Sequence, residues 1–169
     1  PPGWTIAWLS GLVARDLNQL EKAEKNFRSV IEDRTTEMAR RGFDFSKDYR
    51  VVNLLGQTYF DRARQLRTPE VAEQRQAFLE KAVETFHRAL EVDSENVTAH
   101  YNLQQLYREL GNNQKARYHT ELHAKFKPDD NARDQAVGRA KARYPAAIAA
   151  AEEAVFYRLQ RPGAPGLPS

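Results

Sequence analysis

A pattern of small and aromatic residues recurs along this chain at a fixed distance, and this period constrains the fold more than any other feature. The segment around Ala116 aligns with the segment around Ala82 at a shift of 34 residues. A period of this length indicates repeated supersecondary units, each too small to bury its own apolar face. Such units become stable by stacking on their neighbours, so we expect several similar units packed in series.

The composition indicates that these units are helical. Hydrophobic residues make up 41% of the chain and charged residues 29%, which is ordinary for a soluble globular protein. Leu, Ala, Glu, Lys, Arg and Gln are abundant, and alternating apolar and polar runs typical of strands are nearly absent. We predict helices at 4–17, 20–33, 48–67, 69–92, 97–110, 113–126 and 131–143.

Three stretches resemble the tetratricopeptide repeat, whose pattern runs from a bulky residue through Leu-Gly, Tyr, Ala, an aromatic residue and Ala to Pro. The first has Gly11, Ala14, Ala23, Phe27 and Val30; the second has Leu55, Gly56, Tyr59, Ala82, Phe86 and Ala89; the third has Leu103, Tyr107, Gly111, Ala116 and Pro128. The resemblance covers residues 4–130. It implies an all-α fold: a right-handed α-solenoid of three helix hairpins followed by a C-terminal capping helix.

The domain boundaries follow from this pattern. We predict a helical repeat domain over residues 1–144 and a partly flexible extension over 145–169. The domain would contain motifs near 4–37, 49–96 and 97–130 and a cap at 131–143.

Two insertions interrupt the period. Gly11 and Gly56 are 45 residues apart, 11 more than the repeat, and the extra residues lie around 34–45. Gly56 and Ala82 are 26 residues apart, where the repeat has about 12. Thr68-Pro69, an N-cap followed by Pro, stands in the middle of that second excess, which predicts a long hairpin with its tip at this dipeptide.

A second resemblance involves the C-terminal part of the chain. Residues 101–103, 127–134 and 159–163 are similar to tetratricopeptide regions appended to bacterial multihaem cytochromes. This similarity implies an exported, periplasmic parent protein whose haem-binding part lies outside this chain. Without it, a cytoplasmic location is expected.

Catalytic and metal chemistry finds little support in the sequence. There are no cysteines, which excludes disulfides, thiolate metal sites and covalent haem attachment within the chain. His119 and His123 are spaced i, i+4, but no third ligand completes a metal set, so we interpret them as exposed helical histidines. Neither a Gly-rich phosphate loop nor a nucleophile signature is present. We therefore expect no enzyme activity, no metal and no cofactor.

The charge and hydropathy of the chain limit the classes of partner that it is expected to bind. No apolar run approaches the length of about 18 residues needed to cross a bilayer, so we expect no membrane span. The formal charge is +3, and basic residues are interleaved with acidic ones instead of lining one groove. This pattern disfavours nucleic acid.

The resemblance implies that the first helix of each hairpin lines a concave face that binds a peptide or a partner-protein segment. On each of these helices, the predicted binding positions lie next to the residues that pack against the second helix. They are Trp8, Leu12 and Arg15 in the first motif, Asn53, Gln57 and Phe60 in the second, and Tyr101, Gln105 and Arg108 in the third. Amides and Arg suit an extended backbone or a carboxylate, and the aromatic rings can hold apolar side chains.

Alternatives to this interpretation stay open. The same aromatic residues are equally suited to core or inter-repeat packing. The module could be a self-associating or assembly arm of a larger electron-transfer protein, or a helical repeat that binds RNA.

Overall fold

The computed structural model describes residues 3–128, 138–139 and 142–143 of the 169-residue chain. The elements in these residues are α1 (Gly3–Asp16), α2 (Leu20–Glu32), α3 (Thr36–Arg41), the 3-10 helix η1 (Phe45–Lys47), α4 (Tyr49–Gln65), the 3-10 helix η2 (Pro69–Val71), α5 (Ala72–Val92), α6 (Val97–Glu109) and α7 (Asn113–Phe126). No strand occurs among the described residues, which confirms the all-α class.

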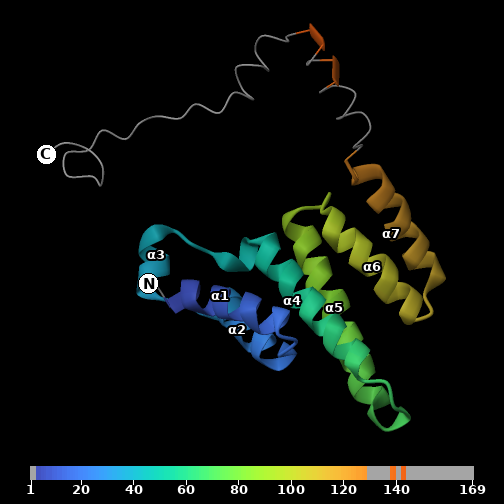
Figure 1. The fold of residues 1–169 in the computed structure, drawn as a ribbon, viewed down its shortest axis with the longest axis horizontal. Helices are drawn as coiled ribbons and strands as arrows, with labels where there is room; N and C mark the ends of the chain where they lie inside the picture. The colour runs from blue at the N-terminus through green and yellow to red at the C-terminus, as the bar shows by residue number, and fades with distance from the viewer. Residues whose placement is uncertain (1–2, 129–137, 140–141, 144–169) are drawn as a thin grey trace, which may run out of the picture. The chain divides into compact units, whose positions relative to one another are not determined.

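The chain divides into two compact units, Pro1–Lys127 and Pro128–Ser169. All of the elements named above belong to the first unit (Figure 1). The predicted capping helix at 131–143 lies mostly outside the described residues, and the predicted extension at 145–169 lies entirely outside them.

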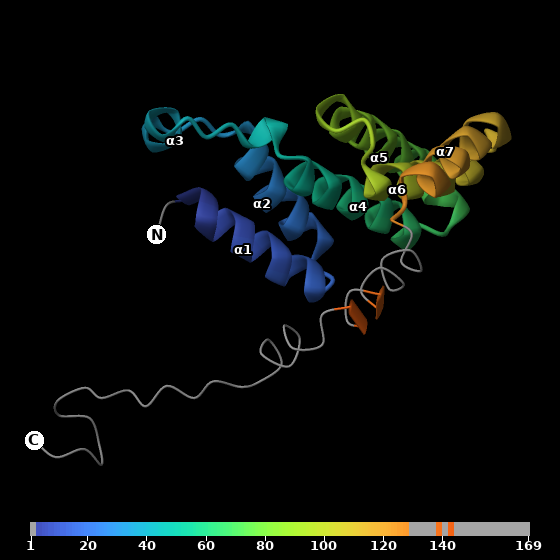
Figure 2. The same ribbon diagram turned by 90° about the horizontal axis from the view of Figure 1, so that it is seen from above.

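The helices of the first unit pack in three consecutive pairs. α1 packs on α2, α4 on α5, and α6 on α7. Contacts of α2 with α4 and of α5 with α6 join the pairs in chain order, so the six helices of the three pairs form a row, with α3 outside it (Figure 2). α4 and α6, the first helices of the second and third pairs, also touch each other.

Close contacts between glycine and phenylalanine hold the first two pairs together. A Cβ atom at Gly11 would lie 2.6 Å from Phe27 Cε1, and one at Gly56 would lie 2.9 Å from Phe86 Cζ. Both rings are fully buried. The small residues therefore let the ring of the second helix lie directly on the backbone of the first.

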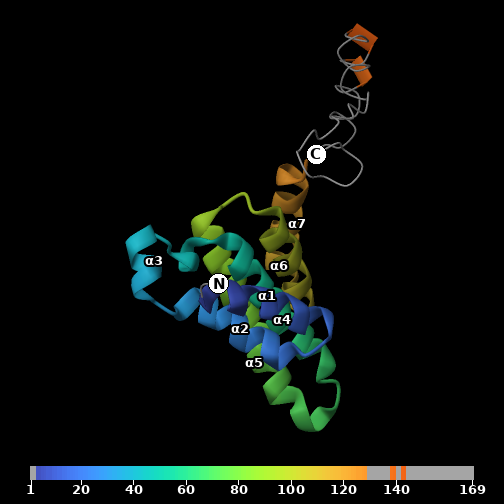
Figure 3. The ribbon, with the colours of Figure 1, turned by 60° about the vertical axis from the view of Figure 1, so that its left-hand side comes forward.

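The middle pair is the longest. α4 has 17 residues and α5 has 21, and their connected ends extend past the neighbouring pairs (Figure 3). Thr68 precedes Pro69 at the start of η2, and both residues are exposed. This arrangement agrees with the predicted long hairpin and its tip.

The insertion between the first and second pairs contains a helix that the sequence interpretation missed. α3 begins where the Thr35 hydroxyl accepts a hydrogen bond from the Met38 N–H at 3.2 Å. It ends at Gly42, whose φ of 69° is a left-handed C-cap. The Met38 side chain is buried, so this short helix is anchored in the fold.

Candidate functional site

A groove runs between α4 and α6 and reaches the end of α1. Its volume is about 420 Å³, which falls in the range typical of ligand sites. The lining residues are Arg15, Gln57, Phe60, Asp61, Arg64, Val97, Thr98, Tyr101, Asn102, Gln105 and His123. We call this surface the α4–α6 groove.

The charged side chains in the groove contact other residues of its lining. Arg15 Nη2 lies 3.2 Å from Asp61 Oδ2, which links α1 to α4. The Arg64 guanidinium lies 4.0 Å above the centroid of the Phe60 ring, and its Nη2 donates to Gln105 Oε1 at 3.4 Å. These contacts leave a polar wall in which cation, carboxylate and amide alternate.

One edge of the groove is aromatic. The Tyr101 side chain on α6 is 47% exposed, and its ring centroid lies 5.4 Å from that of His123 on α7. Two adjacent rings with an open face can cover an apolar side chain of a ligand. Gln57 and Gln105 supply amide groups nearby on the facing helices.

The structure brings together five of the nine predicted binding residues. Arg15, Gln57, Phe60, Tyr101 and Gln105 all line the α4–α6 groove. Phe60 is 1% exposed, so its ring belongs to the core and supports Arg64 from below.

The other four predicted residues lie elsewhere. Trp8 and Leu12 pack on the core, and Trp8 lines a separate pocket with Trp4 and Phe45. Arg108 is exposed outside the groove lining, with Nη2 3.5 Å from Thr120 Oγ1.

Asn53, which was predicted to face the partner, does not line the groove. Its side chain is 6% exposed, and its Nδ2 donates to Asn96 Oδ1 at 2.9 Å. The same oxygen accepts from the Ala99 N–H at 2.9 Å as the N-cap of α6. Asn53 therefore fixes the start of α6 against α4, because its amide is enclosed between the two helices.

Sequence reasoning missed several residues of the groove. Asp61 and Arg64 follow Gln57 by four and seven residues, so helical periodicity places them on the same face of α4. That signal could have identified them. His123 comes from the second helix of its pair, and nothing in its local sequence indicates that it reaches the groove.

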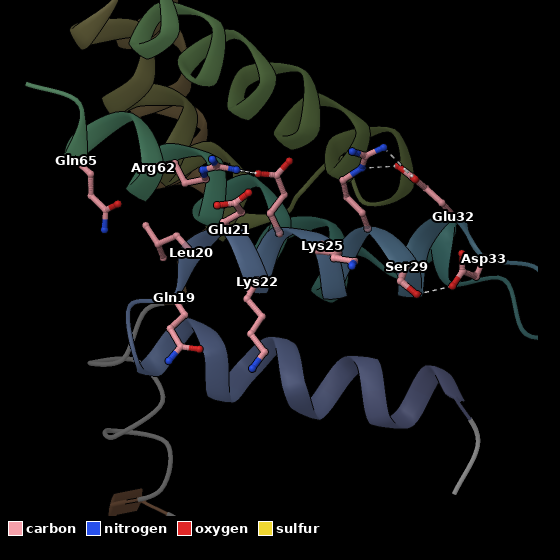
Figure 4. A pocket seen from close by; sticks show the side chains of 12 residues that line it. Gln19, Leu20, Glu21, Lys22, Lys25, Ser29, Glu32, Asp33, Arg62 and Gln65 are labelled. Carbon is pink, nitrogen blue, oxygen red and sulfur yellow. Dashed lines mark hydrogen bonds and ion pairs between the residues drawn. The ribbon is translucent and has the colours of Figure 1, made fainter. Parts of the chain in front are cut away.

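A second, larger groove lies along α2 and has a volume of about 890 Å³ (Figure 4). Two ion pairs lie within it, Arg62 with Glu24 and Arg28 with Glu32 at 3.0 Å. The Ser29 hydroxyl donates to the Asp33 carboxylate. Unlike the α4–α6 groove, this groove is lined mainly by a second helix of a pair, α2.

Three histidines lie close together where α5, α6 and α7 meet; His100 and His119 are buried, and His87 is exposed. His100 Nδ1 lies 3.0 Å from His119 Nδ1, and His100 Nε2 lies 3.1 Å from the Ser94 carbonyl oxygen. His87 Nε2 lies 2.8 Å from the Tyr107 hydroxyl. His119 is only 4% exposed, so its interpretation as a surface residue is wrong.

The surroundings of His119 and His87 favour the neutral form of these two rings. Burial, followed by the nearby His100 and His87, lowers the pKa of His119 to about 4. Burial also lowers the pKa of His87. Since a carbonyl oxygen only accepts, His100 Nε2 donates to Ser94, and in the neutral ring its Nδ1 accepts from His119.

Within the described part of the chain, no group of three or more His, Asp or Glu side chains is placed to hold a metal ion. None of the described helices is long and apolar enough to cross a membrane. No protein-family model matches the chain, and no curated protein matches its sequence.

Proposed function

We propose that this chain is a tetratricopeptide-type interaction module that binds an extended peptide or partner-protein segment in the α4–α6 groove. One observation carries the proposal: the groove is lined by the first helix of every pair. Arg15 comes from α1, Gln57 from α4 and Tyr101 from α6. In a solenoid of stacked hairpins, the first helices share one concave surface.

The packing of the pairs supports the repeat assignment. Gly11 with Phe27 and Gly56 with Phe86 make the same contact in successive pairs. Ala23, Ala82 and Ala116, at the matching positions of the second helices, are buried. These are the small and aromatic positions on which the tetratricopeptide pattern depends.

The groove suits an extended backbone. Gln57 and Gln105 can each donate and accept, as a peptide unit does. The Tyr101–His123 edge covers an apolar side chain beside them. A neutral hydrogen bond contributes about 1 kcal/mol, so several such contacts must act together.

The charge pairing favours a polypeptide over nucleic acid. Asp61 pairs with Arg15, and Glu109 Oε1 lies 3.9 Å from Arg64 Nε. Phosphate binding needs cations that are free to replace counterions. The two arginines of the groove already have carboxylate partners.

Selection from a random-peptide display library against the purified chain tests the proposal. Peptides that emerge should bind the wild type, and the Gln57→Ala/Gln105→Ala variant should bind them about 30-fold more weakly, or about 2 kcal/mol. Arg108→Ala is the matched control, because Arg108 is on α6 but outside the groove lining.

Equal affinity of the double variant and the wild type for every selected peptide would refute the groove assignment. Retention of RNA with a steep salt dependence, together with failure to select peptides, would favour the RNA-binding alternative.

A further inference from the structure

α7 is held in the fold by few buried side chains. Ala116 and His119 are the buried residues of this 14-residue helix. By comparison, α4 buries nine of its 17 residues and α6 buries seven of its 13. His119 is the larger of the two side chains that α7 buries, and it can take up a proton. The docking of α7 therefore depends largely on a titratable group.

His119 contacts both neighbouring helices through a histidine cluster, which it forms with His87 of α5 and His100 of α6. Its ring centroid lies 5.3 Å from that of His100 and 5.8 Å from that of His87. The same ring stacks on Tyr107 of α6, with centroids 5.6 Å apart and 12° between the planes. A change in the charge of this one ring therefore acts on the packing of α7 against α5 and α6.

The surroundings of His119 offer no counter-ion to a positive ring. The titratable groups in or beside the cluster are His87 and Glu91 on α5, His100 and Tyr107 on α6, and Lys115 and Tyr118 on α7. Glu91 acts on His87, and no carboxylate of the described residues forms an ion pair or a hydrogen bond with His119. A proton on His119 would thus be a buried charge beside the Lys115 cation, which disfavours the packed state.

α7 can detach without disturbing the first two pairs of helices. α6 packs on α4, α5 and α7, whereas the main packing partner of α7 is α6 alone. α7 also stands at the end of the row of helices that is opposite to α1 (Figure 2). In stacked helical units each unit contacts only its neighbours, so a helix at the end of the row can open locally.

Opening of α7 would change the α4–α6 groove. His123 follows His119 by about one helical turn and lines the groove beside Tyr101, with ring centroids 5.4 Å apart. The other lining residues lie on α1, α4 and α6. α7 therefore supplies one side of the groove, and this side is lost when the helix detaches.

We propose that α7 is an acid-released helix: when His119 takes up a proton, α7 detaches from α6 and opens the His123 side of the α4–α6 groove. A peptide held by that side would keep α7 closed, and acid would in turn weaken the binding of the peptide. This coupling to a peptide rests on the proposed function, whereas the release of α7 does not.

The direction of the effect follows from the two states of His119. Its pKa is about 4 in the closed fold and returns towards the ordinary value of 6.5 when the ring is exposed. The open state therefore binds more protons. The closed state is favoured fully above about pH 6.5 and progressively less as the pH falls towards 4. Between about pH 7.5 and about pH 5, the ratio of open to closed α7 should rise about 25-fold.

Hydrogen–deuterium exchange of the full chain, followed by mass spectrometry, tests the release without a ligand. After correction for the intrinsic pH dependence of exchange, the amides of α7 should lose protection by about 25-fold between about pH 7.5 and about pH 5. The amides of α2 should keep theirs. His119→Gln should remove most of the change, because an amide side chain takes up no proton in this range and can still donate to His100 Nδ1.

Glu121→Gln is the matched control for this exchange experiment, because Glu121 is an exposed titratable residue of the same helix. It should lose protection in α7 as the wild type does. Unchanged protection of α7 in the wild type would overturn the proposal. An equal loss of protection in α2, or the same loss in His119→Gln as in the wild type, would also overturn it.

A selected peptide whose binding is weakened by Tyr101→Ala contacts the α7 side of the groove and tests the coupling. At about 100 times its Kd, it should raise the protection of α7 at about pH 5 by up to about 100-fold. Its Kd should rise on acidification more in the wild type than in His119→Gln. A bound peptide that leaves the protection of α7 unchanged would overturn the link to the groove. If no peptide is selected, the proposed function fails, and the exchange experiment without ligand still decides whether acid releases α7.

Discussion

The hydroxyl of Thr120 on α7 lies 2.7 Å from the side-chain oxygen of Gln104 on α6 and 2.8 Å from the Ala116 carbonyl oxygen of its own helix, and these two acceptors share its single proton. Thr120 stands 34 residues after Phe86, and Gln104 follows Leu103 as Gly56 follows Leu55. The third pair of helices therefore replaces the glycine–phenylalanine contact of the first two pairs with a polar one. Gln104 is 7% exposed, so this bond is enclosed within the pair.

Removing the Thr120 hydroxyl should destabilise the third pair. Thr120→Val keeps the shape but leaves the Gln104 oxygen without its donor, at an expected cost of about 1–3 kcal/mol in the free energy of unfolding. Urea denaturation measures it. Thr85→Val is the control, because Thr85 is buried and bonds only to the Lys81 carbonyl of its own helix among the described residues.

The contact between Gly56 and Phe86 in the second pair leaves no room for a side chain at position 56. In Gly56→Ala the new Cβ would lie 2.9 Å from Phe86 Cζ, so the ring or the helices must move. We expect a loss of about 1–3 kcal/mol despite the better helix propensity of alanine. In Gly3→Ala the new Cβ meets no atom within 4 Å, so stability should be unchanged or slightly higher. Equal unfolding midpoints for the two variants would contradict the close-contact interpretation.

The histidine cluster should make stability depend on pH. His119 has a folded-state pKa of about 4 against an ordinary value of 6.5, so the unfolded chain binds more protons between these values. Its contribution is fully present above about pH 6.5 and is lost as the pH falls towards 4, by up to about 3 kcal/mol. The lowered pKa of His87 acts in the same direction.

Thermal melting at neutral and mildly acidic pH measures this effect. His119→Gln should reduce the fall in melting temperature between the two conditions. His123→Gln is the control, since His123 lies at the edge of the groove and outside the cluster. An unchanged pH dependence in the His119 variant would contradict the assignment.

Substitutions at Asn53 and Gln57 should affect different properties: the first should lower stability, and the second should weaken peptide binding. Asn53→Ala removes the bond to the Asn96 cap and should lower the free energy of unfolding by about 1 kcal/mol. Gln57→Ala, one turn further along α4, should change stability by less than about 0.5 kcal/mol and weaken the binding of a selected peptide. A loss of binding without a loss of stability in Asn53→Ala, or a loss of stability without a loss of binding in Gln57→Ala, would contradict these assignments.

Local signals in the sequence account for the helices that were predicted correctly. Asn96 and Asn112 are N-caps, and the helices that follow them, α6 and α7, begin where predicted. The repeat pattern placed Gly11, Phe27, Gly56 and Phe86 at matching positions of the first two motifs, and the structure shows that each glycine meets the phenylalanine of its own pair. α3 was missed because six residues are too few for a periodic pattern, although Thr35 and Gly42 carried capping signals.

The sequence by itself determined the six helices of the three pairs and part of the groove lining, because these depend on residues close together in the chain or on one face of one helix. Gln57, Tyr101 and Gln105 were found in this way. Only the tertiary structure decided that Asn53 is enclosed by Asn96, 43 residues away. It also decided that His100 meets His119 in the interior. The reason is physical: burial depends on how neighbouring helices pack, and the period of one helix does not specify which polar groups its neighbour will cover.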